Sequence, residues 1–262
     1  MSRIADKFKK LKTEGRKGFI AYVTAGFPDV AGTVQAVQVL EAAGADVIEL
    51  GIPFSDPMAD GPVIQKAATL ALQAGITTPK VLELVRTIRQ TSQIPLVVMT
   101  YVNTILNVGV EKFVRSFADA GLDGIIVPDL PLEESGLLSK YCEQAGIDLI
   151  QLVAPTSPRN RLVAICQKAQ GFVYCVSNTG VTGVREVDFS HIAKVIDIVR
   201  SETDVPPAIG FGIGDARGAQ EAAKHADAVI VGSAIMSRLM DEGLESVSTF
   251  AKSIRRALDE RV

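Results

Sequence analysis

A short sequence phrase recurs four times along the chain and gives the strongest indication of its fold. At residues 43–46, 120–123 and 145–148 the phrase is Ala-Gly-x-Asp, and at 224–227 it is a related version without glycine. Each copy is followed at once by a run of apolar residues. The glycine stands where a helix would need a left-handed C-terminal residue, so each copy predicts a helix that ends and turns into a buried strand.

The apolar runs that follow these phrases belong to a larger set of eight. They are continuous rather than alternating, which is typical of parallel strands covered by helices. The predicted strands are 18–23, 47–50, 96–100, 124–127, 149–152, 172–176, 208–211 and 228–231. Amphipathic helical stretches separate them, at 30–43, 79–91, 110–120, 133–145, 158–169, 189–200, 216–224 and 244–258.

Eight strands that each precede a helix predict an α/β protein with a (β/α)8 TIM barrel. We expect one extra helix before the first strand and short extra helices in the loops after strands 2 and 8. The chain of 262 residues suits one barrel and has no internal break in composition, so residues 1–262 are predicted to form a single domain. An open doubly wound sheet is the competing architecture, but residues 24–28 lack its glycine-rich turn after the first strand.

Charge and cysteine content exclude several classes of function. A net charge of −3 gives no electrostatic reason to expect nucleic acid. The lysine-rich segment 7–12 has helical spacing, which indicates the solvated face of a first helix. Three widely spaced cysteines are more typical of reduced, buried residues than of disulfides or a zinc site. No apolar run approaches membrane-spanning length and no signal-peptide core is present, so we expect a cytoplasmic protein.

In a (β/α)8 barrel the active site lies at the carboxyl ends of the strands. No lysine stands at any of these ends, which argues against a Schiff-base aldolase. His191 and His225, the only histidines, fall in helical stretches, which argues against a histidine-bound metal or a Ser/His triad. The residues that do stand at the predicted strand ends are Thr24, Glu49, Tyr101, Asp129, Thr156, Ser177, Gly212, Gly232 and Ser233.

The loop after the second strand concentrates carboxylates in a rigid backbone. Glu49 ends the strand, Asp56 and Asp60 follow, and three prolines and two glycines restrict residues 51–62. A glutamate that rises from an apolar strand should be partly desolvated, which raises its pKa and suits it to proton transfer. Two alternatives remain at this point: a Glu49 that only holds a loop by hydrogen bonds, and a magnesium site formed by all three carboxylates.

Glycine-bearing loops after strands 7 and 8 predict a phosphate site. Residues 210–214 read Gly-Phe-Gly-Ile-Gly, and residues 232–235 open directly into a short helical pattern. Barrels frequently bind phosphate in these two loops, with backbone N–H groups and a helix N-terminus as donors. Ordinary tight turns are the alternative. The loop 177–184 is long and glycine-hinged, so it is either a flexible connection or a segment that closes over a substrate.

Taken with these motifs, the chain resembles the alpha subunits of tryptophan synthase over about residues 19–257. The segment 49–62, which reads Glu-Leu-Gly-Ile-Pro-Phe-Ser-Asp-Pro-Met-Ala-Asp-Gly-Pro, is the most specific part, and segments 24–28, 180–183 and 210–213 also match. The resemblance implies a barrel that cleaves indole-3-glycerol phosphate to indole and glyceraldehyde 3-phosphate without a cofactor. It also implies a partner, the pyridoxal-phosphate-dependent beta subunit, in an α2β2 complex that receives the indole.

The resemblance further implies a role for each matching residue. Glu49 would protonate indole C3 and Asp60 would bind the indole N–H, while Asp56 would face the beta subunit. The remaining residues fall into two groups, with substrate contacts at Tyr22, Tyr174, Thr182 and Phe211 and phosphate contacts at Gly183, Gly212, Gly232 and Ser233. Members of the family vary at the positions of Tyr22 and Asn178.

The implied chemistry is consistent with the absence of lysine and histidine from the predicted strand ends. Retro-aldol cleavage needs an electron sink, and a protonated indole supplies one without a lysine or a metal ion. Two other classes of function remain open: a different phosphosugar barrel, including an autonomous indole-producing lyase, and a non-enzymatic barrel that senses a phosphometabolite or serves as a scaffold.

Overall fold

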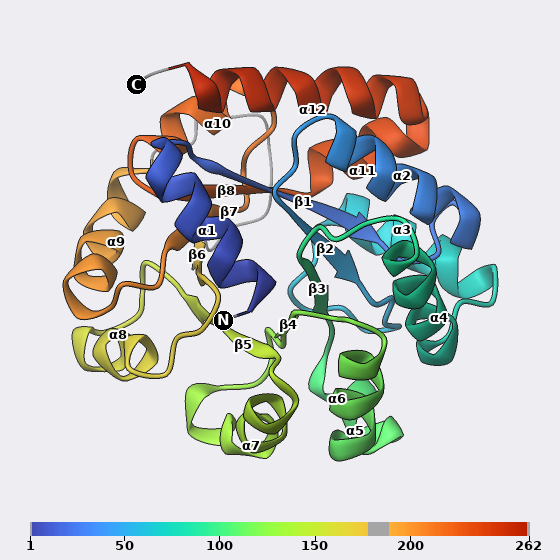
Figure 1. Cartoon of the computed structure of the whole chain (residues 1–262), viewed down its shortest axis with the longest axis horizontal. Helices are drawn as coiled ribbons and strands as arrows, with labels where there is room; N and C mark the ends of the chain where they lie inside the picture. Colours follow the sequence, from blue (N-terminus) through green and yellow to red (C-terminus); the bar gives the residue numbers. More distant parts are fainter. Residues whose placement is uncertain (1, 178–188, 261–262) are drawn as a thin grey trace.

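Eight parallel strands close into a barrel in the order β1 to β8, as the sequence predicts (Figure 1). The structure is a computed structural model that describes residues 2–177 and 189–260. Nearly all strand residues are buried because helices cover the outside of the sheet. The strands are β1 (Gly18–Thr24), β2 (Val47–Gly51), β3 (Leu96–Met99), β4 (Gly124–Ile126), β5 (Asp148–Val153), β6 (Val173–Val176), β7 (Pro207–Gly210) and β8 (Ala228–Val231).

Helices follow the strands around the barrel, and the expected extra ones are present. One helix, α1 (Arg3–Glu14), precedes the first strand, and additional helices follow β2 and β8. The sequence did not reveal α5 (Val102–Val108), which follows β3, or the 3-10 turn η1 (Leu132–Glu134) after β4. The others are α2 (Val30–Ala42), α3 (Pro62–Gln73), α4 (Thr78–Arg89), α6 (Val110–Asp119), α7 (Gly136–Ala145), α8 (Arg159–Cys166), α9 (Ser190–Glu202), α10 (Ala216–Ala223), α11 (Ser233–Asp241) and α12 (Leu244–Asp259).

The recurring Ala-Gly-x-Asp phrase performs two local tasks. Its glycines Gly44, Gly121 and Gly146 all have positive φ, between 68° and 97°, so each turns the chain out of a helix. Its aspartates then bind a neighbouring strand: Asp46 accepts a hydrogen bond from the Phe19 N–H at 3.0 Å, and Asp123 accepts one from Leu96 at 2.8 Å. The phrase therefore ends a helix and fixes the start of a strand.

Helix α1 covers the end of the barrel where the strands begin (Figure 1). Its apolar face, formed by Ile4, Phe8 and Leu11, is buried, whereas the lysines at positions 9, 10 and 12 are exposed. Phe8 packs on Phe172 with ring centroids 6.1 Å apart. The lysine-rich segment is thus the outer face of this helix, as predicted, and the open mouth of the barrel is at the opposite end.

Buried ion pairs join helices to the strand starts at the closed end. Arg255 of α12 lies 3.1 Å from Asp46 and also donates to the Lys17 carbonyl at 3.0 Å. The side chains of Arg255 and Asp46 are only 9% and 8% exposed. Arg89 of α4 pairs in the same way with Asp123, at 2.6 Å. Each of these two aspartates binds an arginine of an outer helix and an N–H group of a strand. The helices and strands are therefore linked to one another at the base of the barrel.

The cysteines Cys142, Cys166 and Cys175 are free and buried, as predicted. In the part of the chain that the structure describes, no helix is both long and apolar enough to cross a membrane.

The buried pair at the base should be essential for stability. Asp46→Ala leaves the Arg255 guanidinium buried beside a lost partner, and we expect it to lower the free energy of unfolding by about 3–5 kcal/mol. Urea unfolding followed by circular dichroism measures the change. Glu14→Ala, which breaks only exposed pairs with Lys10 and Arg16, is the matched control and should cost about 0–1 kcal/mol. Equal losses in the two variants would contradict this account.

Candidate active site

Glu49 is a buried carboxyl group in the wall of the barrel near its mouth. It pairs in register with Tyr22 of β1 and Val97 of β3, and its side chain is 1% exposed. Its Oε2 atom has no hydrogen-bond partner among the described residues. Burial raises the pKa of Glu49 to about 8, and the nearby Asp60 charge adds to the rise. The group is therefore protonated at neutral pH and can donate a proton.

Asp60 approaches the same space from the loop between β2 and α3. Burial raises the pKa of its carboxyl group, while a hydrogen bond from the Tyr101 hydroxyl lowers it again. The backbone carbonyl of Asp60 accepts a hydrogen bond from Gln65 of α3 at 2.8 Å, which holds the end of the loop on the helix. Because Asp60 has a hydroxyl partner and Glu49 Oε2 has none, Asp60 is the carboxylate that is better suited to remain ionised.

Two tyrosine rings of the site lie directly over glycines. A Cβ atom at Gly51 would stand 2.0 Å from the Tyr22 hydroxyl oxygen, and one at Gly210 would stand 2.5 Å from the Tyr174 ring. Both tyrosines are buried, and burial beside the carboxylates raises their pKa values well above the ordinary value. They remain neutral, so these walls are aromatic and uncharged. Gly51 and Gly210 are required because no larger residue leaves room for the rings.

Phe211 follows Gly210 in an unusual backbone conformation. Its φ is 73°, in the left-handed region that residues other than glycine rarely occupy. Its carbonyl accepts a hydrogen bond from the Ser177 hydroxyl at 2.6 Å, and its half-buried ring lies 6.1 Å from the Tyr174 ring between centroids. The strained turn thus places an aromatic ring next to Tyr174 at the mouth.

The residues predicted to bind phosphate are only partly within the described chain. Gly232 precedes α11, and no side chain caps that helix N-terminus. A Cβ atom at Gly232 would contact the Cβ of Tyr22 at 3.4 Å, so this helix end adjoins the tyrosine wall. Ser233 begins the helix, and Gly212, with a φ of 79°, is exposed after β7. Thr182 and Gly183, together with Asn178, lie outside the described residues, as does most of the loop 177–184.

Asp56 does not join the other two carboxyl groups. Its side chain is exposed and accepts a hydrogen bond from the Ser55 hydroxyl at 2.5 Å. Over residues 2–177 and 189–260, no three His, Cys, Asp or Glu side chains are grouped so that they could hold a metal ion. Glu49, Asp56 and Asp60 therefore do not form the alternative magnesium site that the sequence left open. Next to Asp56, Met58 is 85% exposed, so this part of the loop faces outward.

The sequence indicated Tyr101 only as a strand-end residue, but the structure gives it contacts with the loop after β2. Its hydroxyl accepts a hydrogen bond from the Ala59 N–H at 3.0 Å, and its ring stacks on Phe54 with centroids 5.1 Å apart. Three of the four tyrosines in the chain, Tyr22, Tyr101 and Tyr174, thus surround the carboxyl groups.

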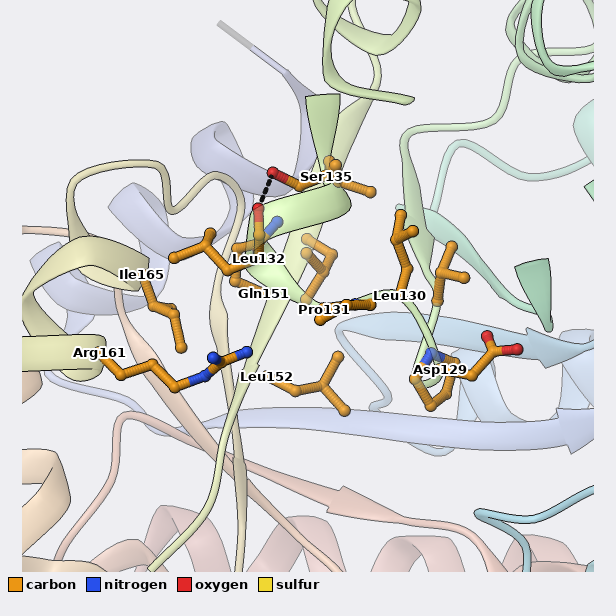
Figure 2. Close-up of a pocket in the computed structure, with 13 residues that line it drawn as sticks. Asp129, Leu130, Pro131, Leu132, Ser135, Gln151, Leu152, Arg161 and Ile165 are labelled. Carbon is orange, nitrogen blue, oxygen red and sulfur yellow. Dashed lines mark hydrogen bonds between the residues drawn. The ribbon is translucent and has the colours of Figure 1, made fainter. Parts of the chain in front are cut away.

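A separate cavity of about 410 Å³ lies between the loop after β4, strand β5, η1 and α8 (Figure 2). Its polar lining groups are mostly engaged elsewhere. Arg161 pairs with Glu133 at 2.7 Å, the Ser135 hydroxyl donates to the Leu132 carbonyl, and Asp129 accepts a hydrogen bond from Val102 at 2.9 Å. Asp129 is therefore a helix-capping residue for α5, and this cavity does not contain the buried acid.

Comparisons with known proteins agree over the whole chain. The family model for the tryptophan synthase alpha chain matches residues 8–259. A tryptophan synthase alpha chain from Synechococcus elongatus is 48% identical over 100% of this chain and 98% of its own length. The crystal structure of tryptophan synthase subunit alpha from Legionella pneumophila superposes with a TM-score of 0.91 at 35% identity, with 100% of each chain covered. A chain of tryptophan synthase from M. tuberculosis, in an aminoacrylate-bound form, superposes with a TM-score of 0.90 at 34% identity, covering 98% of this chain and 100% of that one.

The closed barrel with a buried acid at a strand end is that of a (β/α)8-barrel enzyme, and the family match makes it an enzyme of the lyase type. More particularly, the chain belongs to the tryptophan synthase alpha chain family, which confirms the resemblance found in the sequence.

The fit of Tyr22 over Gly51 can be tested by adding one methyl group. Gly51→Ala should force the Tyr22 ring out of place and lower the free energy of unfolding by about 1–3 kcal/mol. Urea unfolding gives the loss, and Gly136→Ala, which adds a methyl group where nothing lies within 4 Å, is the control. Adding Tyr22→Leu to Gly51→Ala should restore part of the loss. Independent, additive effects of the two changes would show that the ring and the glycine are not coupled.

The raised pKa of Glu49 should make stability depend on pH. The pKa rises from its ordinary value of 4.5 to about 8 on folding, so its contribution is fully present below pH 4.5 and is lost as pH rises toward 8. Glu49→Gln removes the titration. Its stability relative to the unchanged protein should therefore increase by about 1.4 kcal/mol per pH unit within that window. Urea unfolding at pH 5, 6.5 and 8 measures the difference, and a difference that does not change with pH would contradict the assignment.

Proposed function

We propose that this protein cleaves indole-3-glycerol phosphate to indole and glyceraldehyde 3-phosphate by a retro-aldol reaction. The observation that supports this most strongly is the buried, protonated Glu49 with an unpartnered oxygen, set among uncharged aromatic walls. Its proton goes to indole C3. The C3–C3′ bond then breaks and its electron pair returns to the indole ring. The C3′ hydroxyl becomes the aldehyde as its proton passes to a base, and the Glu49 carboxylate formed in the first step is available to accept it.

Asp60 has the complementary role in this proposal. Protonation at C3 places a positive charge on the indole nitrogen, and an ionised carboxylate that accepts the indole N–H stabilises that charge. The Tyr101 hydroxyl favours the ionised form of Asp60. Glu49 and Asp60 interact electrostatically, yet their surroundings favour different protonation states. Such a difference between two neighbouring carboxyl groups is what separate acid and charge-stabilising roles require.

The remaining site residues would bind the substrate. In the proposal Tyr22, Tyr174, Phe211 and Thr182 contact the indole and glycerol parts. The uncapped N-terminus of α11 supports phosphate binding, because free N–H groups and the helix dipole favour an anion there. The residues proposed for the phosphate are Gly183, Gly212, Gly232 and Ser233.

The proposal includes a partner and no cofactor on this chain. The indole that this reaction forms would pass to the pyridoxal-phosphate-dependent beta subunit in an α2β2 complex. Asp56 and the exposed Met58 support an outward-facing contact on the loop after β2. A cytoplasmic location is also proposed, since these reactions use soluble metabolites.

The test is an indole-formation assay on the purified protein, alone and with a cognate beta subunit. We expect weak activity alone and stimulation by the partner. Glu49→Gln should lower the rate by at least the order of 10²–10⁴ that a positioned proton-transfer group contributes, with folding intact. Lys10→Gln, a change on the exposed face of α1, is the control and should keep full activity.

Each other outcome points to a specific alternative. High turnover without the beta subunit would indicate an autonomous lyase. Binding of indole-3-glycerol phosphate without product would favour a sensor or scaffold. A Glu49→Gln variant that retained most of its activity would overturn the assigned mechanism.

A further inference from the structure

Tyr101 is held rigidly at the carboxyl end of β3. The preceding N–H, of Thr100, donates to the Ile126 carbonyl of β4 at 3.0 Å, and the following N–H, of Val102, donates to Asp129 at 2.9 Å. Tyr101 itself is 4% exposed and precedes helix α5. Its backbone is therefore fixed to the next strand and to the loop that follows that strand. The side chain projects from a part of the barrel that has little freedom to move.

The loop after β2, which contains Asp60, contacts Tyr101 through the tyrosine side chain. The Tyr101 ring stacks on Phe54 near the start of the loop, with an interplanar angle of 26°. Its hydroxyl oxygen accepts the Ala59 N–H near the end of the loop at 3.0 Å, and the same hydroxyl group is close enough to the Asp60 carboxyl group to lower its pKa. A single tyrosine thus contacts both ends of a loop in which Asp56 and Met58 are exposed.

The donor and acceptor groups of a phenol determine which partner each part of the Tyr101 hydroxyl can bind. A tyrosine hydroxyl has one proton to donate and an oxygen that can accept. Ala59 can only donate through its N–H, so the single phenolic proton is left for Asp60. A bond from this proton to Asp60 is therefore strongest when Asp60 is ionised, and it would occupy one carboxylate oxygen and leave the other for a substrate.

We propose that Tyr101 is a positioning residue that orients the ionised Asp60 and couples its geometry to the outer part of the loop after β2. This inference deepens the proposed function and rests on it for the role of Asp60. A contact that moves residues 54–59 is transmitted to Asp60 through one ring and one hydroxyl group. The loop and its carboxylate consequently move together.

Tyr101→Phe tests the proposal because it removes both hydroxyl bonds and keeps the ring on Phe54. A hydrogen bond to a charged group is worth enough to predict a fall in kcat for indole formation of about 10- to 100-fold, with a smaller change in KM. Tyr141→Phe, on α7 away from the site, is the matched control and should leave kcat unchanged. Urea unfolding of both variants shows whether each is folded under the conditions of the activity assay.

The pH profile separates positioning from simple packing. Asp60 must be ionised, so activity falls as pH drops through its pKa. Losing the Tyr101 hydroxyl raises that pKa and should shift the acid limb of kcat/KM to higher pH. Other titratable groups around Asp60 are Glu49 of β2, Tyr22 of β1 and Tyr174 of β6, and Asp129 faces Tyr101 from the loop after β4. None of them is changed in the variant.

A double-mutant cycle and a substrate-free measurement complete the test. In an Asp60→Asn background, Tyr101→Phe should lower kcat by much less than it does alone, since the orienting contact is already altered. Hydrogen exchange at the Ala59 amide should be faster in Tyr101→Phe than in the unchanged protein. An unchanged acid limb, additive effects on kcat, or unchanged Ala59 exchange in a folded Tyr101→Phe variant would overturn the inference. Absence of indole formation in the unchanged protein would instead overturn the proposed function, and the exchange result would still be readable.

Discussion

Burial of an uncompensated carboxyl group at Glu49 sets the conditions for the whole mouth of the barrel. A side chain that is 1% exposed and has an unpartnered oxygen cannot carry a charge without a large desolvation cost, so it keeps its proton. Its neighbours Tyr22 and Tyr174 are neutral for the same reason. The mouth is therefore a region of low polarity in which Asp60, unlike Glu49, has a hydroxyl group beside it that favours its ionised form.

That arrangement depends on stability supplied elsewhere in the molecule. At the base, Asp46 and Asp123 each accept a hydrogen bond from a strand amide and pair with a buried arginine. The mouth contains the unpaired acid and the left-handed Phe211. Groups that weaken the folded state are thus concentrated at one end of the barrel, and well-satisfied charges are concentrated at the other.

The fold could be predicted from the sequence because its signals are local. Glycine at the end of a helix, the aspartate that follows and the apolar run are all contained within a few residues. Helix α5 was not predicted because it is only seven residues long and is separated from α6 by Gly109 alone, so the two helices share one apolar stretch. For the site, strand-end position and family resemblance together indicated Glu49 and Asp60. The contact of Tyr101 with Ala59 was not predictable, since it joins residues 42 positions apart through a hydroxyl group.

The link between Arg255 and Asp46 has a consequence for how the chain is made. Arg255 belongs to the last helix, yet its guanidinium contacts the residues that introduce β1 and β2, the first two strands. A ribosome releases these strands long before it synthesises their partner. The early strands must therefore wait without this arginine until α12 has been made, and the barrel can close only after β8, which pairs with β1, has also been made.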